Sequence, residues 1–190
     1  MIQVNIQNEK VLSAKKKQLK ELTFELVKED GSRDTQIREV FNPGNAVCVL
    51  LFSRIKKTVL LTRQFRLASW LNGNPEGRLL EACAGILEKD DAEKEIMREI
   101  KEETGYEIDE VKKIFEAYTS PGSNSERVTF FVAEYSDDMK TGEGGGLKDE
   151  HEDIEIVELP FSVARTMLTS GEIKDAKTII LLQYAAMNIF

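Results

Sequence analysis

The sequence predicts an α/β protein with one main core and a small antiparallel β module at its N-terminus. Three observations lead to this prediction. A chain of 190 residues can bury one sizeable core. After residue 42, apolar runs with the length of strands alternate with segments of helical periodicity. Before residue 42, apolar and polar residues alternate, which is typical of strands with one covered face.

Residues 1–42 are expected to form the N-terminal β module, and residues 43–190 the main domain. Apolar residues recur at every second position around Val4 and around Phe24, and an Asp-Gly pair at 30–31 supplies a hairpin turn. A small antiparallel module rarely stands alone. We therefore expect it to pack on its own domain or on a second subunit.

The main domain contains strand-like runs, helical segments and one long loop. A helix is predicted over 91–103, with Asp90 or Asp91 as N-cap and Gly105 at its end. Residues 141–152 form a Gly-rich acidic loop, and a loop of this length inside a domain is often functional, although a surface insertion without a role is the alternative. The remaining expected elements are strands over 46–52, 58–62, 78–84, 113–119, 127–135 and 154–159, and helices over 162–169 and 175–189.

Bulk properties exclude several classes of protein. The net charge of −8 argues against a nucleic-acid polymer as partner, because binding to its backbone needs a basic face. We expect no membrane partner and a cytoplasmic location, since no run reaches roughly 18 apolar residues and the N-terminus lacks the apolar core of a secretory signal. Cys48 and Cys83 lie in apolar runs and are expected to be buried reduced thiols, with a disulfide or a catalytic thiol as the alternatives.

Three glutamates in the predicted helix carry the strongest functional signal. Glu99, Glu102 and Glu103 stand at i, i+3 and i+4, so that they project within one sector of the helix. Like charges at this spacing repel each other, and a divalent cation among them would offset the cost. The alternative is a solvated acidic face on which Arg98 pairs with Glu102.

The residues around these glutamates form a longer motif. Ala84-Gly85 ends a strand before the helix, and Arg98-Glu99, Glu102-Glu103 and Gly105 follow. This pattern resembles the signature of the Nudix hydrolases, although the spacing from Gly85 to Arg98 is one residue short and Asp91 replaces the first Glu. Further stretches, at 63–66, 72–74, 81–85 and 120–122, are similar to the ADP-ribose pyrophosphatase branch of that family.

The resemblance implies a Nudix α/β/α sandwich with a mixed sheet, and a homodimer whose N-terminal strands exchange between subunits. It implies Mg²⁺ as cofactor, for which Mn²⁺ can substitute, and hydrolysis of the diphosphate of a nucleotide sugar. The similarity is strongest to members that act on GDP-mannose, which implies GMP and mannose 1-phosphate as products. ADP-ribose or another nucleotide sugar is the alternative substrate, and a non-catalytic nucleotide-sugar sensor is the alternative class of protein.

The resemblance also implies roles for individual residues. Metal ligands are Glu99, Glu103 and the Ala84 carbonyl, with Glu102 binding directly or through water, and Arg98 orients a carboxylate. A loop glutamate is metal ligand or general base. Glu152 fits this role best, Glu150 is its rival, and the neighbouring His151 is expected to be a plain loop residue. The residues expected at the substrate are Ile37, Arg38, Glu39, Arg66, Gly85, Ile86, Glu126 and Lys177.

Overall fold

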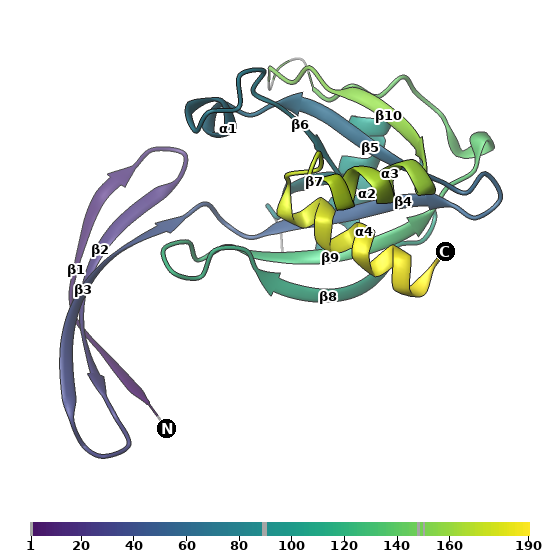
Figure 1. Ribbon diagram of the computed structural model, residues 1–190. Coiled ribbons are helices and arrows are strands. Elements are labelled where there is room, and N and C mark those ends of the chain that lie inside the picture. The colour runs from purple at the N-terminus through teal and green to yellow at the C-terminus, as the bar shows by residue number, and fades with distance from the viewer. Residues whose placement is uncertain (1, 89–90, 148, 150) are drawn as a thin grey trace. The chain divides into compact units, whose positions relative to one another are not determined.

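The computed structural model describes residues 2–88, 91–147, 149 and 151–190, and their contacts divide the chain into two compact units (Figure 1). The small unit comprises Met1–Asn45 and Tyr118–Arg127, and the large unit comprises Ala46–Ala117 and Val128–Phe190. Both the N-terminal sheet and the main core expected from the sequence are present.

The small unit is a three-stranded antiparallel sheet in the order β1-β2-β3, formed by β1 (Gln3–Ala14), β2 (Gln18–Val27) and β3 (Arg33–Asn42). The predicted turn is confirmed, because Gly31 has φ +79° and the Asp30 side chain accepts a hydrogen bond from the Ser32 amide at 2.9 Å. Residues 118–127 join this unit through the Phe41 amide, which donates to the Ser123 carbonyl at 2.8 Å.

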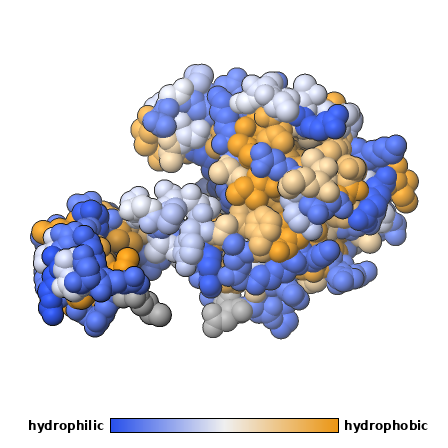
Figure 2. All heavy atoms as spheres, turned by 60° about the horizontal axis from the view of Figure 1, so that its bottom comes forward, coloured by the Kyte–Doolittle hydropathy of each residue, from blue (hydrophilic) through white to orange (hydrophobic). Residues whose placement is uncertain are grey.

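The N-terminal sheet has no buried core of its own. None of the described residues of β1, β2 and β3 is buried, and Figure 2 shows hydrophobic side chains at the surface of this unit among hydrophilic ones. The exposed apolar side chains of the three strands are Val4, Ile6, Val11, Leu12, Ile37 and Phe41. A sheet of this size needs a second layer for stability.

The large unit is built on a seven-stranded mixed sheet with the path β10-β5-β4-β9-β8. β4 (Ala46–Ser53) pairs parallel with β9 (Arg127–Glu134) and antiparallel with β5 (Thr58–Phe65). The other strands on the path are β8 (Lys112–Tyr118) and β10 (Glu155–Pro160), and the helices are α1 (Leu67–Leu71), α2 (Ala92–Thr104), α3 (Phe161–Ser170) and α4 (Ala176–Asn188).

The single strand predicted over 78–84 is wrong. The segment forms two short strands, β6 (Arg78–Glu81), which pairs with β5, and β7 (Cys83–Ile86), which pairs with β4. β4 and β5 pair with each other only near their hairpin, over Leu51–Ser53 and Thr58–Leu60, and the crossover at Ala82 fills the space where they diverge. The short helix α1 was also not predicted.

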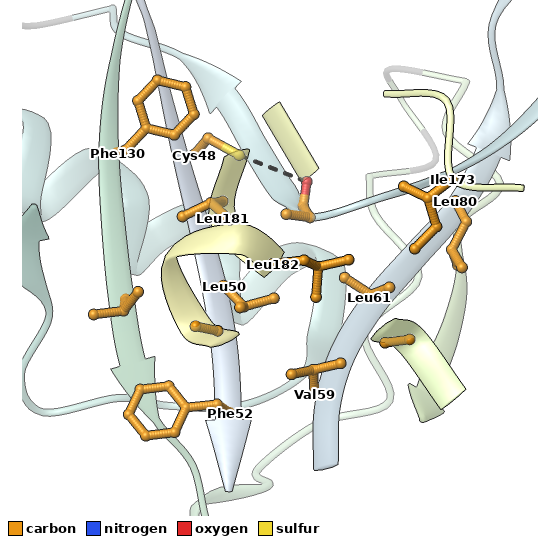
Figure 3. Packing of buried hydrophobic residues seen from close by; sticks show 14 of the residues in the cluster. Cys48, Leu50, Phe52, Val59, Leu61, Leu80, Phe130, Ile173, Leu181 and Leu182 are labelled. Atoms are coloured by element: carbon orange, nitrogen blue, oxygen red, sulfur yellow. Dashed lines mark hydrogen bonds between the residues drawn. The ribbon is translucent and has the colours of Figure 1, made fainter. Parts of the chain in front are cut away.

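Helices cover both faces of this sheet, which confirms the predicted α/β/α sandwich. In Figure 1, α3 and α4 lie in front of the sheet and α2 lies behind it. Alternate β4 residues face the two layers. Cys48 and Leu50 pack with Leu181 and Leu182 of α4 (Figure 3), whereas Val49 belongs to the cluster that contains Ile96 and Ile100 of α2.

Both cysteines are free and buried, as predicted, and the Cys48 sulfur lies 4.0 Å from the Ala82 carbonyl (Figure 3). Burial raises the pKa of the Cys83 thiol well above its usual value, so this thiol stays protonated.

Within the described part of the chain, no helix combines the length and the apolar character that crossing a membrane requires.

Candidate active site

Helix α2 carries the glutamate cluster, and its ends are set by the residues expected from the sequence. Asp91 is the N-cap, because its side chain accepts a hydrogen bond from the Lys94 amide at 3.2 Å, whereas the alternative Asp90 lies outside the described residues. Gly105 ends the helix in the left-handed conformation with φ +75°. Ile96 and Ile100 are completely buried, so they fix which side of α2 faces the sheet.

Glu103 is the most buried of the three glutamates. Its side chain is 2% exposed, and its Oε2 has no hydrogen-bond partner among the described residues. Burial raises the pKa of Glu103 to about 8. The Cys83 thiol, a hydrogen-bond partner of this carboxylate, opposes the rise, and the charges of Glu99 and Glu152 add to it. An unpartnered oxygen in such a place is an available ligand for a cation.

Glu99 stands beside Glu103 and beside strand β7. Burial raises the pKa of Glu99 to about 7 against the pull of Arg98, and Glu102, Glu95 and Glu152 contribute to the rise. The backbone of β7 approaches this carboxylate so closely that a Cβ on Gly85 would overlap it. The Ala84 carbonyl and the Gly85-Ile86 backbone therefore belong to the strand that borders Glu99.

Arg98 connects three carboxylates of α2. Its guanidinium donates to Glu95, with an Nε–Oε1 distance of 2.9 Å, to Glu99, with an Nη2–Oε1 distance of 2.6 Å, and to Glu102. The Arg98–Glu102 ion pair is also predicted by the alternative interpretation, in which the glutamates form a solvated acidic face of the helix. The bond to the buried Glu95 shows that Arg98 also orders the inner side of the helix.

The loop that follows β9 brings Glu152 to this helix. The Leu147 amide donates to Glu152 Oε2 at 2.9 Å, and Glu152 acts on the pKa of both Glu99 and Glu103. Its rival Glu150 lies outside the described residues. A cavity of about 270 Å³ opens here, and it is lined by Gln64, Phe65, Arg66, His151, Glu152 and Asp153.

Cations from two other segments lie next to the carboxylates. Arg66 Nε is 2.8 Å from Oε2 of Glu81, and Lys177 Nζ is 2.7 Å from Oδ1 of Asp175. Burial raises the pKa of Glu81, while Arg66 and Lys177 both oppose this rise, which places the two cations around one carboxylate. The charge of Arg66 also lowers the pKa of Glu103, so it acts on both Glu81 and Glu103.

The other residues expected at the substrate belong to the small unit. Ile37, Arg38 and Glu39 lie on β3, where Arg38 Nη1 donates to the Ile37 carbonyl at 2.8 Å. Glu126 lies in the segment 118–127, and its Oε2 accepts a hydrogen bond from the Thr119 hydroxyl at 2.9 Å. All four are therefore placed in one unit of the chain.

Sequence reasoning missed several charged residues of the site. Glu81, Glu95 and Asp175 are all buried. They pair with Arg66, Arg98 and Lys177 respectively, which the sequence does single out. A signal was present for Glu81, because a lone carboxylate inside the apolar run 79–84 must be paired if that run is buried.

The donor set fits a hard divalent cation. Within the part of the chain that the structure describes, no three His, Cys, Asp or Glu side chains form a closed cage for a metal ion. Mg²⁺ does not need such a cage, because it keeps several waters and binds through one or two carboxylates. A cation at Glu99 and Glu103 would stabilise the charged forms that burial disfavours.

Comparison with known proteins agrees with these observations. The NUDIX domain model matches residues 42–181, and the model for the GDP-mannose pyrophosphatase NudK N-terminal domain matches residues 3–41. Relatives from Escherichia coli O157:H7 and Shigella dysenteriae serotype 1 (strain Sd197), both named GDP-mannose pyrophosphatase, are 48% identical over 98% of this chain and 96% of their own. The crystal structure of an ADP compounds hydrolase shares the fold, with a TM-score of 0.72, 19% identity, and coverage of 97% of this chain and 92% of its own.

Proposed function

The chain belongs to the Nudix family, and from this membership we propose that it hydrolyses the diphosphate of a nucleotide sugar. The leading substrate is GDP-mannose, with GMP and mannose 1-phosphate as products. The similarity to relatives named GDP-mannose pyrophosphatase along nearly the whole chain supports this substrate. The observation that carries the chemistry is the desolvated carboxylate pair of Glu99 and Glu103, with Glu152 close enough to act on both.

In this proposal the cofactor is Mg²⁺, for which Mn²⁺ can substitute. Glu99 and Glu103 hold it together with the Ala84 carbonyl, and Glu102 supports it directly or through water. Arg98 fixes the orientation of the carboxylates to which it donates. The bound cation would neutralise the diphosphate and lower the pKa of a coordinated water.

The side chains around the carboxylates supply the rest of the chemistry. Glu152 accepts the proton of the water that attacks phosphorus in line, and Glu150 is the alternative acceptor. Arg66 and Lys177 bind oxygens of the diphosphate, for which the forked guanidinium of arginine is well suited. The backbone of Gly85 and Ile86 contacts the same group. The products separate without a covalent intermediate.

We further propose that the protein is a homodimer in which the N-terminal strands exchange between subunits. The support is the apolar surface of β1–β3, which is not buried within its own unit. In the dimer, Ile37, Arg38, Glu39 and Glu126 contact the substrate. The domain boundary after residue 42 and a cytoplasmic location belong to the same proposal, and the two free thiols are compatible with a reducing compartment.

A substrate panel tests the proposed function. We expect GDP-mannose to have the highest kcat/KM among GDP-mannose, ADP-ribose and other sugar nucleotides in Mg²⁺, and no turnover in EDTA. If kcat/KM for ADP-ribose were about tenfold higher than for GDP-mannose, ADP-ribose would be the assigned substrate instead. Tight binding of GDP-mannose without turnover would instead establish the sensor. Mg²⁺ should also raise the melting temperature by mass action.

A further inference from the structure

The Gly-rich loop is hydrogen-bonded to the C-terminal end of α2. The last four carbonyls of a helix lack partners within the helix. Here the Gly145 amide donates to the Glu103 carbonyl at 2.9 Å, and the Gly146 amide donates to the Glu102 carbonyl at 3.0 Å. The Gly142 amide donates to the carbonyl of Gly105 at 3.0 Å. The loop is thus fixed to two of the three α2 residues that belong to the proposed metal site.

The same short segment holds Glu152 from its other side. The next amide along the chain, that of Leu147, donates to Glu152 Oε2 at 2.9 Å, and the Glu152 amide donates back to the Leu147 carbonyl at 3.3 Å. The Ile154 amide donates to the Gly145 carbonyl at 3.2 Å. Three consecutive amides, at 145, 146 and 147, therefore connect α2 to Glu152.

Glycine is required at both ends of this connection. Gly144, Gly145 and Gly146 have φ values of +70°, +99° and +80°, which side chains other than glycine rarely adopt. A Cβ at Gly144 would lie 2.7 Å from the Glu103 carbonyl oxygen, whereas a Cβ at Gly146 would lie 2.7 Å from the Cβ of Glu152. Because that atom adjoins the backbone, rotation of the Glu152 side chain cannot relieve the overlap.

We propose that Gly144–Leu147 is a positioning segment that holds Glu152 at a fixed place relative to Glu99 and Glu103. This inference rests on the proposed function, because it assigns Glu152 a role with the metal and the attacking water. The segment itself touches no substrate. It acts through Glu152, and a displacement of that carboxylate by about 1 Å is enough to slow a reaction that depends on alignment.

A double-mutant cycle between Gly146 and Glu152 tests the inference, with kcat and Mn²⁺ affinity as separate readouts. Gly146→Ala should lower kcat by about tenfold or more and leave KM within about twofold. In the Glu152→Gln background, Gly146→Ala should cause no further decrease in kcat, because its effect acts through the Glu152 carboxylate. Mn²⁺ affinity, measured by electron paramagnetic resonance without substrate, should show the same non-additivity.

An alanine variant of the same loop, outside the positioning segment, serves as the control. A Cβ at Gly142 would meet only an atom of Gly105, at 3.9 Å. Gly142→Ala should therefore keep kcat within about threefold of wild type once the folded fraction is accounted for.

The outcomes separate this inference from the proposed function. Additive losses in the cycle, or equal losses in Gly146→Ala and Gly142→Ala, would overturn the inference while wild type remains an active diphosphatase. A Glu152→Gln variant with normal kcat and normal Mn²⁺ affinity would overturn it as well. If wild type hydrolyses no nucleotide sugar but the Mn²⁺ cycle is non-additive, the proposed function fails and the positioning segment stands.

Discussion

Replacing Glu103 by Gln should make the metal-free protein more stable while it removes the activity. The folded protein holds this carboxyl with a pKa of about 8, because burial disfavours its charge, against an ordinary value of 4.5 in the unfolded chain. Below the pKa of the unfolded chain, the carboxyl is protonated in both states and does not lower the stability. As the pH rises from the unfolded pKa toward the folded pKa, only the unfolded chain ionises freely, so the folded state loses stability. At pH 7 the loss amounts to about 3 kcal/mol.

The assay is urea unfolding in EDTA at several pH values. The stability difference between Glu103→Gln and wild type should widen in favour of the variant by about 4 kcal/mol from pH 5 to pH 9. The change with pH is the decisive quantity, because the buried amide of Gln adds a constant cost of its own. Glu110→Gln provides the matched control, because it makes the same chemical change at an exposed carboxylate.

A difference that stays constant within about 1 kcal/mol over this range would refute the reasoning, because Glu103 would then ionise as freely in the folded protein as in the unfolded chain. Mg²⁺ should reduce the stability difference between Glu103→Gln and wild type, because it stabilises wild type by binding to it. The same substitution should lower kcat by about a hundredfold or more, since it removes a charged oxygen ligand.

Three further substitutions test the surroundings of the site. Arg98→Ala releases the carboxylates that the guanidinium holds, and should weaken Mg²⁺ activation by about 10- to 100-fold, measured as the Mg²⁺ concentration for half-maximal rate. Gly85→Ala adds a methyl group that would overlap the Glu99 carboxylate, so it should reduce Mn²⁺ affinity while the circular dichroism spectrum stays unchanged. Gly122→Ala is the control, because a Cβ there has no neighbour within 4 Å, and it should resemble wild type in both measurements. Asp175→Ala removes both the N-cap of α4 and the ion-pair partner of Lys177, and should lower the free energy of unfolding by more than about 1 kcal/mol in urea titrations. An unchanged stability would show that neither interaction contributes.

Helix α2 could be predicted closely because its signals are local. Its cap at Asp91, its apolar stripe and its terminal Gly105 all lie within 15 residues, and they agree with one another. Glu103 stands three residues after Ile100 and seven after Ile96, so its burial follows from the same periodicity. Local sequence was therefore sufficient for the part of the site that sits on one helix.

The gathering of the cations around Glu81 could not be predicted in the same way. Arg66 pairs with Glu81 across neighbouring strands, whereas Lys177 pairs with Asp175, two residues away, at the start of α4. That Lys177 also acts on Glu81 depends on where α4 docks against the sheet, which is a long-range property. The split of 78–86 into two strands was missed for the same reason.

The crossover at Ala82 has a consequence for how the protein can change. Helix α4 packs on β6 and α2 packs on β7, and the Ala82 amide between these strands donates to the Thr178 hydroxyl at 2.7 Å. Lys177 and the candidate metal ligands Glu99 and Glu103 thus lie on helices on opposite faces of the sheet, and both helices pack on the short segment that crosses over at Ala82. A library that varies Lys177 while it keeps 98–105, Asp175 and Thr178 should alter the preference for the sugar nucleotide without disturbing the glutamates, so that selectivity and chemistry can evolve separately.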